Sequence, residues 1–214
     1  MQFKEEMLHC YLVGGSQDTG HDPEKFLAAV SLAMDSGITA FQYREKGTSR
    51  LSLDQRVQLG RKLRQLADQH SIPLIVDDDL ELAKTIRADG LHVGQKDQQI
   101  ERVLAEAGEL FVGYSCNQPE QIAHANRLPV AYVGSGPIFP TNSKNDADPA
   151  IGLDALSALV KQSVHPGVAI GGISEDNMTQ TVQTGAAGLS MISMILQSPD
   201  IAETVHRVNS LYRK

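Results

Sequence analysis

Two observations on the 214-residue sequence predict an α/β fold, built as a single (β/α)8 TIM barrel. First, short apolar runs rich in β-branched residues alternate with stretches of helical character along the whole chain. Second, about eight βα units fit into this length at roughly 27 residues each, a compact version of a fold that usually has about 250 residues. A doubly wound open sheet is the alternative, because sequence alone does not show that the first and last strands pair. We expect residues 1–214 to form one domain, without a linker or low-complexity tract.

The expected strands are the apolar β-branched runs, at residues 11–13, 40–43, 74–76, 91–93, 110–112, 131–133, 168–170 and 189–192. Helices are expected between them, at residues 23–36, 53–69, 80–86, 98–107, 120–126, 153–161, 175–184 and 201–212. The first helix carries both end signals, since Pro23 lies near its start and Gly37 just past its end.

Composition excludes several function classes. Hydrophobic residues make up 41% and charged residues 21%, which is typical of a globular protein. The two cysteines are too few for a disulfide scaffold. We expect neither a signal peptide nor a membrane span, and therefore a cytoplasmic protein with reduced thiols. The net charge of −7 argues against binding to nucleic acid or an anionic membrane. An anionic ligand therefore needs a local cationic pocket or a metal ion.

Polar and charged residues cluster where the predicted strands end, which is where barrels and open sheets place their chemistry. Gln42, Arg44 and Lys46 are spaced by two and project to one side while the chain is extended. An arginine fork beside a lysine suits a diphosphate. A solvated rim pair with Glu45 is the alternative.

Three aspartates follow the third predicted strand. Such a run of like charges needs a cation or a helix N-terminus to offset it. Asp79 suits the N-cap of the next helix, which leaves Asp78 for a metal. Asp97, after the next strand, could reach the same Mg²⁺ or could cap the helix near residue 98.

A phosphate site is indicated at the last two strands. Gly171-Gly172 and Ile192-Ser193 follow them, at the position where barrels often bind phosphate through backbone N–H groups. The long loop 136–152 has the length of a lid or binding element, and its Thr141, Ser143 and Lys144 suit phosphate oxygens. A tight turn is the alternative for the glycines.

The remaining candidates carry weaker signals. Ser115 could hydrogen-bond a ligand or could be a turn residue, and His92 is expected to be a hydrogen-bonded core or rim histidine. The other histidines lack metal-ligand spacing, so we expect no zinc site. Cys116 has no His–Asp pattern that would indicate a nucleophile.

Taken together, the ordered motifs resemble those of the thiamine-phosphate synthase family, from about residue 11 to residue 193: QYREKG, IVDDDLELA, ADGLHVGQKD, GYS, YVGSGPIFPTNSK, AIGGI and GLSMIS. The resemblance implies a (β/α)8-barrel transferase of thiamine biosynthesis. Such an enzyme joins hydroxymethylpyrimidine diphosphate to thiazole phosphate with Mg²⁺, forming thiamine phosphate and diphosphate. Its implied partners are these small molecules, with a homo-oligomer as a further option.

The resemblance also implies roles for single residues. The residues that it implies to be catalytic are Arg44, Lys46, Ser115 and Lys144. The residues that it implies to bind Mg²⁺ are Asp78 and Asp97. Substrate contacts fall on Gln42, Tyr43, Arg44, Glu45, Lys46, Asp77, Ser115, Thr141, Asn142, Ser143, Lys144, Gly172, Ile192 and Ser193.

Two positions depart from the family pattern. Asp77 stands where Asn is common, and Ser143 where Thr is usual. The first places a negative charge near a diphosphate, so Asp77 should be neutralised by the metal or a cation such as Lys46, or else protonated. Two other functions remain open: a thiazole tautomerase paralogue, whose histidine position holds Asn117 here, and a non-catalytic phosphate-binding barrel.

Overall fold

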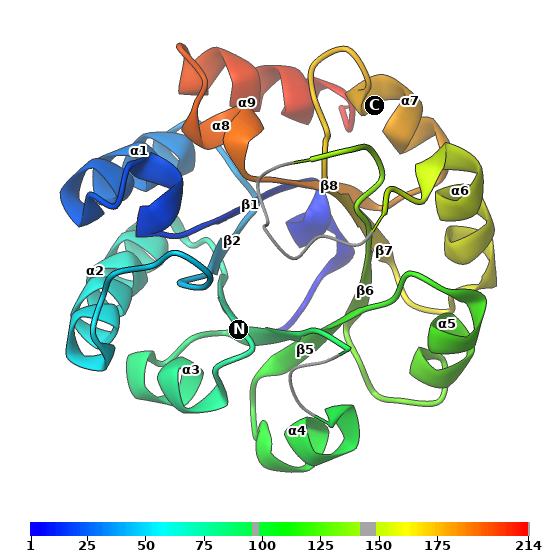
Figure 1. Ribbon diagram of the computed structural model, residues 1–214, viewed down its shortest axis with the longest axis horizontal. Helices are drawn as coiled ribbons and strands as arrows, with labels where there is room; N and C mark the ends of the chain where they lie inside the picture. Colours follow the sequence, from blue (N-terminus) through cyan, green and yellow to red (C-terminus); the bar gives the residue numbers. More distant parts are fainter. Residues whose placement is uncertain (96–98, 142–148, 214) are drawn as a thin grey trace.

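The computed structural model is a closed barrel of parallel strands surrounded by helices (Figure 1). It describes residues 1–95, 99–141 and 149–213. Strand β1 pairs with β8 as well as with β2, which confirms the predicted (β/α)8 barrel and excludes the open sheet. The strands follow one another around the barrel in chain order: β1 (Cys10–Gly14), β2 (Ala40–Tyr43), β3 (Leu74–Asp77), β4 (Gly90–Val93), β5 (Phe111–Ser115), β6 (Tyr132–Ser135), β7 (Gly167–Ile170) and β8 (Gly188–Met191).

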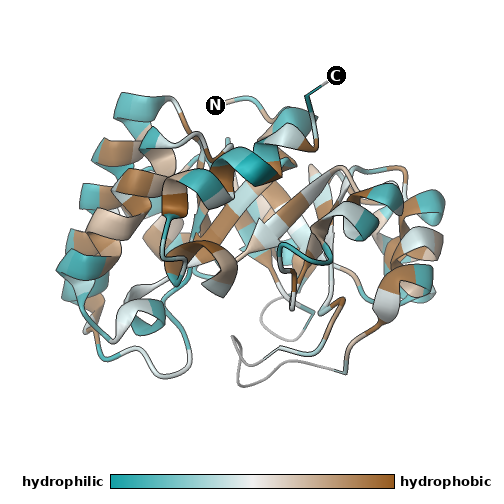
Figure 2. Ribbon diagram, turned by 90° about the horizontal axis from the view of Figure 1, so that it is seen from above, coloured by the Kyte–Doolittle hydropathy of each residue, from teal (hydrophilic) through white to brown (hydrophobic). Residues whose placement is uncertain are grey.

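The helices cover the outside of the barrel, with polar residues concentrated on their outer faces (Figure 2). None of them is long and apolar enough, within the described ranges, to cross a membrane. The helices are α1 (Pro23–Asp35), α2 (Leu53–His70), α3 (Leu80–Ile86), α4 (Ile100–Glu106), α5 (Pro119–Ala125), α6 (Gly152–Gln162), α7 (Met178–Gln183), α8 (Ser193–Leu196) and α9 (Ile201–Ser210), with 3-10 helices η1 (Glu5–Leu8) and η2 (Ser16–Thr19).

Side-chain caps begin several of these helices where the sequence indicates. Asp22 accepts hydrogen bonds from backbone N–H groups at the start of α1, and Pro23 occupies the first turn. Ser52 caps α2 as part of a capping box. Asp79 accepts from the Leu82 N–H at 2.9 Å, which confirms its predicted role as the N-cap of α3. These caps help to fix where the chain turns from each strand end into its helix.

The helix η1 at the N-terminal end of the barrel packs directly against β8. A Cβ atom at Gly188 would lie 1.7 Å from the Leu8 carbonyl oxygen, so this contact requires glycine. We expect Gly188→Ala to lower the free energy of unfolding by about 3 kcal/mol. The melting temperature should fall by roughly 6–12 °C, as calorimetry can measure.

Gly167→Ala is the matched control, because Gly167 begins β7 as Gly188 begins β8. A Cβ atom there would lie 3.4 Å from its nearest neighbour, in ordinary van der Waals contact. Equal melting temperatures for the two variants would contradict the role of this close approach.

Candidate active site

A cavity of about 260 Å³ opens at the C-terminal ends of the strands. The candidate site was predicted from the sequence at this end of the barrel. Nine of the predicted site residues line it: Arg44, Lys46, Asp77, Asp78, Ser115, Thr141, Gly172, Ile192 and Ser193.

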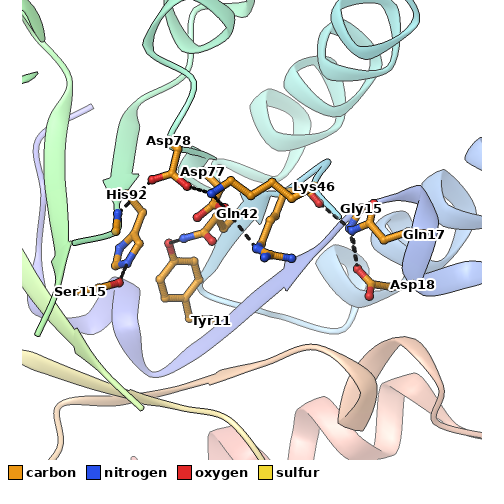
Figure 3. Close-up of polar contacts among 12 residues, drawn as sticks. Tyr11, Gly15, Gln17, Asp18, Gln42, Lys46, Asp77, Asp78, His92 and Ser115 are labelled. Atoms are coloured by element: carbon orange, nitrogen blue, oxygen red, sulfur yellow. Dashed lines mark hydrogen bonds and ion pairs between the residues drawn. The ribbon is translucent and has the colours of Figure 1, made fainter. Parts of the chain in front are cut away.

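One side of the cavity holds a cluster of opposite charges at the ends of β2 and β3 (Figure 3). The Arg44 Nε lies 3.2 Å from the Asp77 carboxylate, and the Lys46 Nζ lies 3.7 Å from the same group. Lys46 also forms an ion pair with Asp78. The expectation that Asp77 is neutralised by a cation such as Lys46 therefore agrees with these contacts. We call these four residues the charged cluster.

The carboxylate of Asp78 is positioned by its own backbone conformation and by the residue that follows β4. Its backbone has a φ of +57°, and the Gly94 N–H donates to its Oδ1 at 2.9 Å. Burial, and then the neighbouring charge of Asp77, raise the pKa of Asp78 to about 6. A cationic group beside it counteracts both effects, and Lys46 supplies one here.

Tyr43 and Glu45 alternate with Gln42, Arg44 and Lys46 along the chain, and their side chains lie in different surroundings, as alternation along an extended segment predicts. Tyr43 lies on the side facing α2, where its hydroxyl donates to the Arg56 carbonyl at 3.3 Å. The buried Glu45 accepts from the Ser16 N–H at 2.6 Å and also from the Ser49 hydroxyl. Neither Tyr43 nor Glu45 lines the cavity. Glu45 instead ties the loops after β1 and β2 together, so the alternative of a solvated rim pair does not describe it.

Gln42 and Ser115 belong to a polar layer inside the barrel. Gln42 is only 4% exposed and donates to the Tyr11 hydroxyl, whereas Ser115 reaches the cavity and contacts His92. Both ring nitrogens of His92 are hydrogen-bonded, to Ser115 and to Tyr132, as expected for this histidine.

The opposite side of the cavity is formed by the loops after β6, β7 and β8. Gly171 and Gly172 have φ values of +96° and +67°. A Cβ atom at Gly172 would lie 2.7 Å from the carbonyl oxygens of Phe139 and Pro140, so this loop packs tightly on the one after β6. Thr141 and Ser193 bring hydroxyl groups to the same side. Hydroxyl and backbone N–H groups of this kind suit phosphate oxygens.

Sequence reasoning did not assign His92, Gln95 and Asn117 to the site, yet all three line the cavity. Gln95 donates to the Ser115 carbonyl at 2.6 Å, and Asn117 accepts from the Gly136 N–H at 2.8 Å. The available signal was their position, since His92 lies in the predicted strand 91–93, Gln95 lies two residues past it, and Asn117 lies in the segment between the predicted strand 110–112 and the next helix. Four predicted site residues lie outside the described residues: Asp97, Asn142, Ser143 and Lys144. The proposed capping role of Asp97 lies outside them too.

The fold and this polar cavity define a (β/α)8-barrel enzyme. The chain belongs to the thiamine monophosphate synthase family, whose model matches residues 10–195. It is a transferase of thiamine biosynthesis, a thiamine-phosphate synthase that acts on small molecules.

Similar proteins agree with this assignment over their full length. The chain is 60% identical to a thiamine-phosphate synthase of Limosilactobacillus fermentum, covering 99% of this chain and 100% of the relative. It is 54% identical to one from Limosilactobacillus reuteri, with 100% of both chains covered. Among solved structures, a thiamine phosphate pyrophosphorylase from Pyrococcus furiosus superposes with a TM-score of 0.85 at 29% identity, covering 97% of this chain and 96% of the other.

Proposed function

We propose that this chain joins hydroxymethylpyrimidine diphosphate to thiazole phosphate in this cavity, with Mg²⁺, releasing diphosphate and forming thiamine phosphate. The observation that carries the proposal is the division of one cavity into two ends. Arg44 and Lys46 follow β2 at one end, and the other end is formed by the glycine loop after β7 and by Ser193 after β8. Two anionic groups can therefore bind in the same cavity without competing for the same partners.

At the cationic end, Arg44 and Lys46 bind the diphosphate and stabilise the charge that develops as the pyrimidine CH2–O bond ionises. The electron-rich pyrimidine ring supports the resulting cation. Catalysis is then mainly electrostatic and positional, so it needs neither a general base nor a covalent nucleophile. Ser115 contacts the pyrimidine, Gln42 supports it from inside the barrel, and Lys144 contributes a further cation to the diphosphate.

The donor set of the charged cluster fits Mg²⁺. Asp77 and Asp78 place carboxylate oxygens beside each other, and the Lys46 ammonium group already bridges them. Carboxylate oxygens are the usual protein ligands of Mg²⁺, which is commonly held by one or two of them together with substrate phosphates. Asp78 and Asp97 would hold the ion, and when bound it would neutralise charge on the departing diphosphate.

At the other end, the thiazole phosphate binds to Gly172, Ile192, Ser193 and residues 141–143. With the phosphate held there, the thiazole nitrogen is oriented toward the CH2 carbon from which the diphosphate departs, and its lone pair forms the new C–N bond. Asn117 counts against the tautomerase alternative, because a neutral amide does not exchange protons and its oxygen is already bound to the Gly136 N–H.

The reaction is tested by mixing pure protein, Mg²⁺ and both substrates and detecting thiamine phosphate and diphosphate by mass spectrometry. We expect both products in equal amounts, loss of activity in excess chelator and recovery when Mg²⁺ is restored. Full activity in excess chelator would contradict the metal assignment. Product formation without diphosphate release would contradict the reaction itself.

Replacement of Asp77 by Asn isolates the role of its charge. Because Asp77 is paired with Arg44 and Lys46, Asp77→Asn removes a charge that competes with the diphosphate for these cations but also supports the nearby metal. We expect activity within about tenfold of the parent protein, equivalent to about 1.4 kcal/mol. More Mg²⁺ should be needed for half-maximal activity, and a Mg²⁺ titration checks this. An unchanged Mg²⁺ requirement would contradict support of the metal by the Asp77 charge.

We further propose that the reaction takes place in the cytoplasm. Cys10 and Cys116 are both buried free thiols, which suits a reducing compartment. A homo-oligomer remains our proposal for the assembly, to be measured by analytical ultracentrifugation.

A further inference from the structure

A chain of side-chain hydrogen bonds crosses the interior of the barrel and ends at the cavity. The Gln42 Nε2 donates to the Tyr11 hydroxyl at 2.7 Å, and the Tyr11 and Tyr132 hydroxyls are 2.9 Å apart. The Tyr132 hydroxyl lies 3.0 Å from the His92 Nδ1, and the His92 Nε2 lies 2.9 Å from the Ser115 Oγ. Figure 3 shows the two ends of this chain, Gln42 with Tyr11 and His92 with Ser115.

Two glycines leave space for the side chains of this hydrogen-bond chain. Asp77, His92, Gly113 and Tyr132 are register partners on successive strands. A Cβ atom at Gly113 would lie 2.1 Å from the Tyr132 ring, so its absence lets Tyr132 reach across β5 to His92. On β6, a Cβ atom at Gly134 would approach the His92 ring to 3.1 Å. The sequence therefore accommodates this particular pair of rings.

Counting donors and acceptors gives one direction for each bond in which every proton of this hydrogen-bond chain has an acceptor. The Gln42 nitrogen donates and cannot accept, so of the two partners of the Tyr11 hydroxyl only Tyr132 can accept its single proton. Tyr132 then donates its own proton to the His92 Nδ1. Burial raises the pKa of both phenols above the ordinary value, so each keeps the one proton that this count requires.

We infer that His92 is a positioning residue that sets the hydrogen-bonding direction of Ser115. With Nδ1 as an acceptor, His92 is neutral and carries its proton on Nε2, which donates to Ser115. The Ser115 hydroxyl, which lines the cavity, directs its own proton to the ligand. Ser115 therefore selects a ligand atom that accepts a hydrogen bond, such as a pyrimidine ring nitrogen, over an N–H group. The identity of that ligand rests on the proposed function.

The direction can be measured in the parent protein without any substrate. Uniformly ¹⁵N-labelled histidine gives separate signals for protonated and unprotonated ring nitrogens, and the signals that disappear in His92→Leu belong to His92. We expect a protonated Nε2 and an unprotonated Nδ1. A proton on Nδ1, or on both nitrogens, would overturn the inference. This result does not depend on the reaction or on the folding of any variant beyond the one used for assignment.

Kinetics test the coupling between the two side chains. We expect His92→Leu and Ser115→Ala each to raise the KM for the pyrimidine diphosphate about tenfold, as for loss of one hydrogen bond. The double variant should be no worse than Ser115→Ala alone, because both act through one contact. His92→Gln keeps a donor near the position of Nε2 and should recover most of the loss.

The KM for thiazole phosphate should stay within about twofold in all these variants, because its proposed site is on the far side of the cavity. Multiplicative effects in the double variant, or an equal rise for both substrates, would overturn the positioning role. A parent protein that forms no thiamine phosphate would refute the proposed function, while the ¹⁵N spectrum would still decide the direction of the chain.

Discussion

Ser193→Asp is expected to raise the KM for thiazole phosphate by about 1,000-fold and to leave the KM for the pyrimidine diphosphate nearly unchanged. Ser193 lines the glycine-loop end of the cavity, where the substrate phosphate is proposed to bind. A carboxylate about 4 Å from a phosphate oxygen costs about 4 kcal/mol at an effective dielectric constant of 20. That cost corresponds to roughly three orders of magnitude in affinity. Steady-state kinetics with each substrate varied in turn measure the effect.

Ser193→Asn is the matched control, because it adds almost the same volume without the charge. We expect its effect on the KM for thiazole phosphate to be much smaller than that of Ser193→Asp. Lys46→Gln is the complementary variant, since Lys46 lies in the charged cluster and should affect the diphosphate substrate instead. If Ser193→Asp and Lys46→Gln impaired the same substrate, the proposed division of the cavity would be wrong.

Most of the barrel was predictable because its strands are short, apolar and separated by helices with clear end signals. The predicted third helix, 80–86, matches α3, where Asp79 supplies the cap. The seventh predicted helix, 175–184, begins three residues too early. There, the Asn177 side chain accepts from the Ser174 N–H and forms a local turn that competes with the helix. Pairing of β1 with β8 could not be read from the sequence, because it depends on closure of the whole sheet.

The candidate site was predictable where residue type and strand position agreed. Arg44 and Lys46 share the cavity as their spacing of two indicates, whereas Tyr43 and Glu45, included through the family resemblance, do not line it. The hydrogen-bond chain through Tyr132 could not be predicted, because it crosses β5 at Gly113 and depends on which side chains meet inside the barrel. The Asp77 ion pairs likewise depend on the register between β2 and β3.

Asp78→Asn is expected to lower kcat about 100-fold at millimolar Mg²⁺ and to raise the Mg²⁺ concentration needed for half-maximal activity. A loss of this size is about 2.7 kcal/mol, within the range for removal of one group that stabilises transition-state charge. Asn keeps an oxygen for the Gly94 N–H and tolerates the left-handed backbone at this position, so the variant should fold. Kinetics over a Mg²⁺ titration, with thermal melting as a check of folding, measure the result.

Asp79→Asn is the control, since it removes the same charge one residue further along the chain. Asn is as good an N-cap as Asp, so α3 should keep its start and the activity should stay within about twofold of the parent. A similar loss in both variants would indicate a general effect of charge at the end of β3, not binding of the metal by Asp78.

The Mg²⁺ titration also distinguishes the two roles that Asp78 could have, as a partner of Lys46 and as a ligand of Mg²⁺. In the structure its carboxylate is paired with Lys46, so Asp78→Asn removes one of the two ion pairs of this lysine as well as a proposed metal ligand. If Asp78 acted only by holding Lys46, the KM for the pyrimidine diphosphate would rise while the Mg²⁺ requirement stayed the same. If it binds the metal, the Mg²⁺ requirement rises and excess Mg²⁺ restores part of kcat. We expect the second result, because the Lys46 ammonium group keeps its contact with Asp77 when Asp78 loses its charge.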